Sequence, residues 1–191
     1  MKDTVMSNVL RISIMSAWVA LAGLASGTAA AAPGCTIASF DPVVDFGAMR
    51  APAGSDVSSI TPAPQRRTFS ATCASDTTMS IVFDAPAQGA AGMRFGERGA
   101  YRARVVSARL DGSPVAIARQ PAPGALPGAD ASNELALLPS DVFAPASGRE
   151  LLRGKRLDVV IEIAPTIPAD AVRINQQVNF NATAELRVVT P

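Results

Sequence analysis

Apolar and polar residues alternate along much of this chain, and no segment keeps a helical period over roughly eleven residues. Over 157–163 every second residue, from Leu157 to Ile163, is apolar. The alternation is longest over 178–188, where apolar and polar side chains fall on opposite faces. A period of two is typical of a β-strand with one buried side. The last segment is therefore predicted to be a long antiparallel strand.

Shorter apolar runs, bounded by Gly, Pro, Asn and Asp, predict further strands earlier in the chain. Asp111 and Gly112 form a typical two-residue hairpin signal between two of these runs. Several short strands at this spacing predict an all-β sandwich. The expected strands are 35–49 (interrupted at Pro42), 67–73, 79–83, 101–110 and 115–118, with 135–143 as a weak strand or a turn of helix and with loops at 50–65, 85–92 and 119–134.

Residues 1–32 have the pattern of a secretory signal peptide. Lys2 and Arg11 precede an apolar run over 12–24, and small residues suited to cleavage follow at 29–32. A membrane anchor is the alternative, but a span needs about 20 apolar residues. We therefore expect export, with 33–191 as a single mature domain that has no integral membrane segment.

Cys35 and Cys73 are the only cysteines, and both follow the predicted signal. In an exported protein this pairing predicts one disulfide. Closing a loop of this length contributes roughly 4 kcal/mol to stability. Lipidation of Cys35 is a competing interpretation, and so is a pair of free thiols or metal ligands. A zinc site needs four clustered Cys or His ligands, and the chain has no histidine.

Composition narrows the function classes further. Removal of Lys2, Arg11 and Asp3 with the signal leaves 15 basic and 15 acidic residues, so nothing indicates nucleic acid as a partner. Without histidine a Ser-His-Asp triad is impossible, and we expect no metal, no cofactor and no enzyme activity. Paired carboxylates leave a hydrolase as a remaining alternative; the aspartates considered for it are Asp41, Asp45, Asp84 and Asp158.

A set of short motifs, in a fixed order, resembles the bacterial fimbrial subunits of the chaperone–usher kind. The resemblance extends over nearly the whole mature chain and is nearest to a poorly characterised group of β-fimbria major subunits. The motifs are an early Cys35, VDFG at 44–47, TFSATC at 68–73, Phe95-Gly96, GAY at 99–101, LDG at 110–112 and the alternating last segment.

This resemblance implies an immunoglobulin-like sandwich that lacks its final strand, a pilin-type incomplete fold. The missing strand leaves an apolar groove, which a periplasmic chaperone fills first and the N-terminal extension of another subunit fills later. Carried over to this chain, Ile37 would line one wall, and Pro191 would carry the anchored carboxylate. The other wall would be formed by Phe180, Ala182, Ala184, Leu186 and Val188.

The chain departs from the family before its first cysteine. Cleavage after residue 32 leaves only Pro33 and Gly34, which at about 3.3 Å per residue are too short to donate a strand. We therefore expect a structural or adhesive fimbrial subunit that accepts a strand, in a tip position, and that passes through the periplasm with a chaperone and usher to the fimbria or cell surface. The alternative is a secreted, monomeric β-sandwich binding module of the cell envelope.

A glycan-binding surface is a further expectation for an adhesive subunit. Arg102, Arg104 and Arg109 form an Arg-rich strand, and the loop 119–134 is an equal candidate. An ordinary solvated strand face is the favoured interpretation of the arginines, and the sequence does not choose between this strand and the loop as an adhesive site.

Overall fold

The structure, a computed structural model, describes residues 34–39, 43–47, 49, 57–89, 92–172 and 180–191. All of these residues belong to one unit, Ala32–Pro191. The predicted signal peptide lies outside the described residues, and so do Asp41 and Pro42. Among the residues that are described, no helix is long and apolar enough to cross a membrane.

The larger of two antiparallel sheets contains the longest strands. Its main order places the first strand at one edge: β1 (Cys35–Ser39), β3 (Gln65–Thr78), β13 (Arg153–Pro168), β7 (Gly99–Leu110), β6 (Gly92–Phe95) and β5 (Ala87–Gln88). Three short strands pair beside this path: β2 (Ser59–Ile60) with β13, and β8 (Ser113–Pro114) and β10 (Leu135–Leu137) with β7. A single 3₁₀ turn, η1 (Ala169–Ala171), follows β13.

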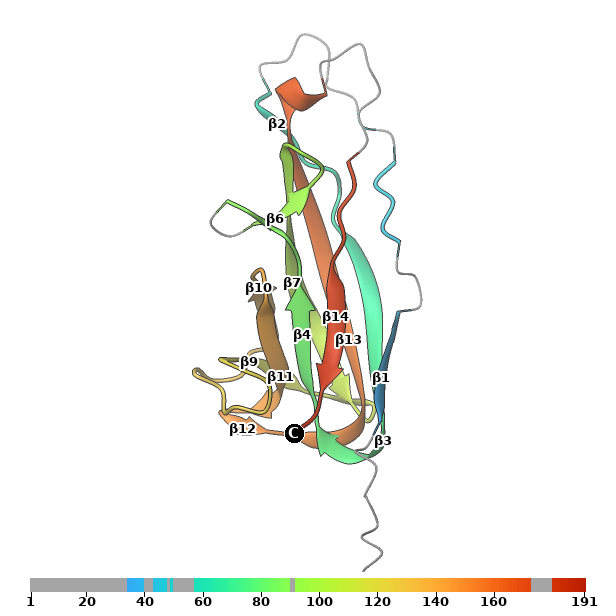
Figure 1. Cartoon of the computed structure of the whole chain (residues 1–191), viewed down its shortest axis with the longest axis vertical. Helices are drawn as coiled ribbons and strands as arrows, with labels where there is room; N and C mark the ends of the chain where they lie inside the picture. The colour runs from blue at the N-terminus through green and yellow to red at the C-terminus, as the bar shows by residue number, and fades with distance from the viewer. Residues whose placement is uncertain (1–33, 40–42, 48, 50–56, 90–91, 173–179) are drawn as a thin grey trace, which may run out of the picture. The chain divides into compact units, whose positions relative to one another are not determined.

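The smaller sheet places the last strand at its edge. Its order is β12 (Glu150–Leu151), β11 (Asp141–Ser147), β4 (Ser80–Asp84) and β14 (Glu185–Val189), with β9 (Ala116–Gln120) also paired to β11. In Figure 1 β14, in red, lies between β4 and the blue β1. The first and last strands are therefore neighbours although they belong to different sheets.

The core lies between the two sheets and is made of the alternating apolar residues. Tyr101, Ala103 and Val105 on β7 are buried, and the arginines between them are exposed. The alternation of buried and exposed residues shifts by one at Val106, which is an extra residue in β7 between the partners of Val160 and Ile161 of β13. The next buried residue is Ala108. The all-β sandwich predicted from the alternation is confirmed.

The predicted disulfide is confirmed as well. Cys35 begins β1 and lies directly opposite Cys73 of β3, so the bond ties the first strand to its neighbour. β1 has only five residues, and two-stranded pairing of that length is weak alone. The disulfide therefore fixes the position of the sheet edge that β1 forms.

The structure corrects several predicted strand bounds. The final strand was expected to run over 178–188 with one buried side, but β14 begins at Glu185, and residues 181–185 are all exposed. Its partner β4 ends at Asp84, and Pro86 follows, so 181–184 have no strand to pair with. The segment 135–143 contains two strands, β10 and the start of β11, and β13 is longer than the predicted 157–163.

We predict that replacing both cysteines, Cys35→Ser with Cys73→Ser, lowers the free energy of unfolding by roughly 4 kcal/mol, because the unfolded chain loses its closed loop. Urea unfolding of the exported chain measures this. Thr36→Ser with Thr72→Ser is the matched control, because these residues form the adjacent cross-strand pair and are both exposed. A loss below about 1 kcal/mol in the cysteine variant would contradict the prediction.

Candidate functional site: a groove between the first and last strands

Two strand edges face each other without pairing. β1 pairs only with β3, and β14 only with β4, within the part of the chain that the structure describes. The two strands are nevertheless in contact. Their facing edges carry backbone groups that take part in no ladder there, and such edges are templates for another strand. The gap between them is the main candidate for a functional site.

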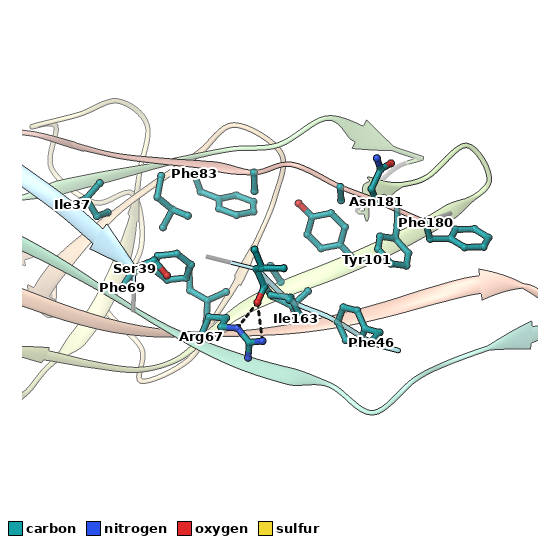
Figure 2. Close-up of a pocket in the computed structure, with 18 of the residues that line it drawn as sticks. Ile37, Ser39, Phe46, Arg67, Phe69, Phe83, Tyr101, Ile163, Phe180 and Asn181 are labelled. Carbon is teal, nitrogen blue, oxygen red and sulfur yellow. Dashed lines mark hydrogen bonds between the residues drawn. The ribbon is translucent and has the colours of Figure 1, made fainter. Parts of the chain in front are cut away.

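An apolar groove of about 510 Å³ lies along these edges. One wall comes from β1 and the segment after it, and the other from residues that precede and begin β14 (Figure 2). The floor is the inner face of the larger sheet together with Phe83 of β4. The other floor residues are Phe69 of β3, Tyr101 and Ala103 of β7, and Ile161 and Ile163 of β13.

The structure brings most of the groove residues named from sequence to this place. Ile37, Phe180, Ala182, Ala184 and Leu186 all line the groove. Ala182 and Ala184 are exposed, because nothing in the described chain covers this wall. Small side chains here leave room for large ones on an occupant.

Two residues named with them lie elsewhere. Val188 packs against the core farther along β14 and does not line the groove. Pro191 is exposed at the end of the chain, and a methyl group on Gly124 would lie 3.7 Å from its Cβ. Pro191 is thus next to the loop after β9 and outside the groove.

Phe180 anchors the open end of the groove. Its ring stacks on Phe95 with centroids 5.7 Å apart, and the amide of Gly96 donates to the carbonyl of Asn181 over 2.8 Å. Gly96 has a φ of +64°, and a Cβ there would lie 2.9 Å from Phe180 Cδ1. The Phe95-Gly96 motif therefore has a structural reason: the turn after β6 accepts Phe180 because it has no side chain at position 96.

Side chains of β3 hold the segment 43–47 against the groove, an arrangement that the sequence analysis missed. Arg67 donates from Nε and a terminal nitrogen to the carbonyl of Val43, at 3.2 and 3.0 Å. Gln65 donates to the carbonyl of Asp45. Phe46 meets Phe95 edge to face, with centroids 6.1 Å apart. No periodic pattern signals such contacts, because they join side chains of one strand to backbone outside any strand.

Besides Arg67 and Asn181, two residues with hydroxyl groups, Ser39 and Tyr101, interrupt the apolar lining. Tyr101 is only 5% exposed, and Figure 2 shows its hydroxyl directed into the groove space. Burial raises the pKa of Tyr101 to about 12. Ser39 Oγ is buried and has no hydrogen-bond partner among the described residues, and Tyr101 likewise makes no hydrogen bond there.

Two of the three arginines named on the Arg-rich strand, Arg104 and Arg109, form hydrogen bonds with other residues of this chain. Arg104 donates to Glu162 of β13 over 2.8 Å and to Glu134 over 3.2 Å, and Arg109 donates to the carbonyl of Gly112. Hydrogen bonds from Arg66 and Arg104 hold the pKa of Glu162 below its usual value. Cross-strand ion pairs thus explain Arg104 as part of a solvated sheet face.

Comparisons with known proteins do not assign this site. No family model, curated protein or solved structure matches the chain. The described residues contain no group of three or more His, Cys, Asp or Glu side chains placed to hold a metal ion. The groove is therefore interpreted from its own geometry.

We predict that Gly96→Ala lowers the free energy of unfolding by about 3 kcal/mol, because the methyl group displaces Phe180 and also strains the backbone. The matched control is Gly112→Ala, whose φ is +83° but which has no atom within 4 Å of the added Cβ. Backbone strain alone should cost the control about 1 kcal/mol. Denaturant unfolding of both variants measures the difference, and equal losses would contradict the packing role of Gly96.

Proposed function

We propose that this protein is a structural or adhesive fimbrial subunit whose groove receives an extended segment of another polypeptide. The observation that carries the proposal is the open apolar groove between the unpaired edges of β1 and β14. Strand addition of this kind uses main-chain hydrogen bonds for affinity and alternate side chains for specificity. It is the assembly mode called donor-strand complementation.

The strand order supports the proposal. Among the described residues, β1-β3-β13-β7 in one sheet faces β14-β4 in the other, with no strand beyond β14. This matches the order expected of an immunoglobulin-like sandwich that lacks its final strand. A strand placed next to β14 would turn every second side chain onto Phe69, Tyr101 and Ile163. It would complete the sheet and remove the floor of the groove from water.

The partners follow from this mode of assembly. A periplasmic chaperone would occupy the groove during transit, an usher would export the subunit, and another fimbrial subunit would supply the final strand. Removal of residues 1–32 would leave two residues before Cys35, which supports a tip position in the fimbria. A surface glycan would be the ligand of such a tip subunit.

We predict that Ala184→Asp prevents strand uptake, because insertion would bury an unpaired carboxylate in an apolar groove. Thr183→Asp is the matched control: both residues are exposed, but Thr183 does not line this groove. The full chain is exported from a bacterial host with and without a periplasmic pilus chaperone, and the complex is measured by size-exclusion chromatography. We expect at least a tenfold loss of complex for Ala184→Asp and an unchanged yield for Thr183→Asp.

A different result would favour the monomeric binding module. If the wild-type chain accumulates as a stable monomer at the same yield without a chaperone, and Ala184→Asp behaves like Thr183→Asp, the groove does not take up a strand. The proposed function would then be wrong.

A further inference from the structure

The groove contains a hydroxyl that the packing of the chain does not require. Tyr101 is the only tyrosine of the protein, whereas phenylalanines line the same groove at 46, 69, 83, 95 and 180. A phenylalanine at 101 would fill the same volume without bringing a polar atom to the floor. The hydroxyl therefore needs an explanation beyond the apolar core.

An occupant of the groove changes the surroundings of this hydroxyl. The open groove that Tyr101 lines has room for water, but a strand laid over Tyr101 would expel that water. A buried hydroxyl left without a partner costs about 1–3 kcal/mol. Ser39 Oγ, on the β1 wall, is already buried without a partner in the described chain. An entirely apolar occupant would thus leave two hydroxyls unsatisfied.

The backbone of an inserted strand cannot supply the hydrogen bond that the Tyr101 hydroxyl lacks. Its N–H and C=O groups lie in the plane of its own sheet and point toward the neighbouring strands, here β14 and β1. Tyr101 belongs to the facing sheet, so only a side chain that points inward reaches its hydroxyl. The hydrogen bond must come from a polar side chain of the occupant.

We infer that the strand that fills this groove carries a hydrogen-bonding side chain, of the Ser, Thr, Asn or Gln class, at an inward position that meets Tyr101 or Ser39. Inward positions that face Phe69, Phe83, Ala103, Ile161 and Ile163 take apolar side chains, because these residues present hydrocarbon to the groove. This inference rests on the proposed function and adds the chemical pattern that the groove selects.

Synthetic peptides of about ten residues test the inference. The parent peptide has Val at every inward position and Ser or Lys at every outward position, and each variant replaces one Val by its isostere Thr. Affinity for the full exported chain is measured by fluorescence anisotropy. We expect Thr to improve binding about fivefold at one or two positions, which corresponds to one net hydrogen bond each, and to weaken binding at the others.

Two conservative variants assign the effect to the hydroxyls. Tyr101→Phe keeps the ring and should abolish the gain at one position while binding the all-Val peptide at least as well as the wild type does. Ser39→Ala should act in the same way at the other position. A gain that disappears in either variant supports the inference.

The alternative outcomes separate the inference from the proposed function. If the all-Val peptide binds more tightly than every Thr variant, the groove takes up strands but does not select a polar side chain, and the inference is wrong. If none of the peptides binds, the proposed function fails, and the inference fails with it.

Discussion

The inner face of the larger sheet needs an apolar cover, and the described chain covers it unevenly. At the Cys35 end, the disulfide and the contact between β1 and β14 bring the two sheet edges together. Toward Phe180 the edges are separated by the groove, whose floor is mostly apolar. Removing apolar area from water is the main favourable term in folding. A strand that enters the groove therefore continues the folding of the sandwich itself.

The wall formed by residues 181–184 is held at both ends without being part of a sheet. The stacking of Phe180 on Phe95 and the bond from Gly96 to Asn181 fix its beginning, and the pairing of Glu185 with Asp84 fixes its end. Between these points the backbone joins no ladder in the described chain. Because its path is already set, an incoming strand would pair with it at a smaller entropic cost than with an unfixed loop.

The sequence predicted the fold class well because alternation reports directly on which side of a strand is buried. The strand near 157–163 was found from its periodicity, and those near 67–73 and 101–110 were found as short runs bounded by turn residues. The bounds of these strands were not predicted correctly. β3 and β13 continue into polar residues that are held by backbone pairing between the two strands and are not buried in the core. The final strand was predicted too long because alternation reports the faces of an extended segment and not whether a partner strand is present: β4 ends at Asp84, so the exposed residues 181–184 have no ladder to join.

The residues of the groove also divide into those that were named from the sequence and those that were missed. Ile37, Ala182, Ala184 and Leu186 were named because the resemblance to fimbrial subunits was carried over onto the first and last strand-like segments, and these residues do line the groove. Arg67 and Gln65, which hold the segment 43–47, were missed because their partners are single carbonyls far away in sequence. Contacts of that kind depend on the tertiary path and have no local signature.

A groove lined only by hydrocarbon would discriminate poorly among apolar strands, because one methylene changes the binding free energy by only about 1–3 kcal/mol. A buried hydroxyl discriminates more strongly, because a strand that cannot pair with it loses a hydrogen bond and also leaves a polar atom desolvated. The open edges of β1 and β14 would otherwise accept any exposed strand, including one from an unfolding neighbour. In a groove that takes up a strand, the hydroxyl of Tyr101 would thus restrict which strand binds well, at some expense in the affinity for purely apolar strands.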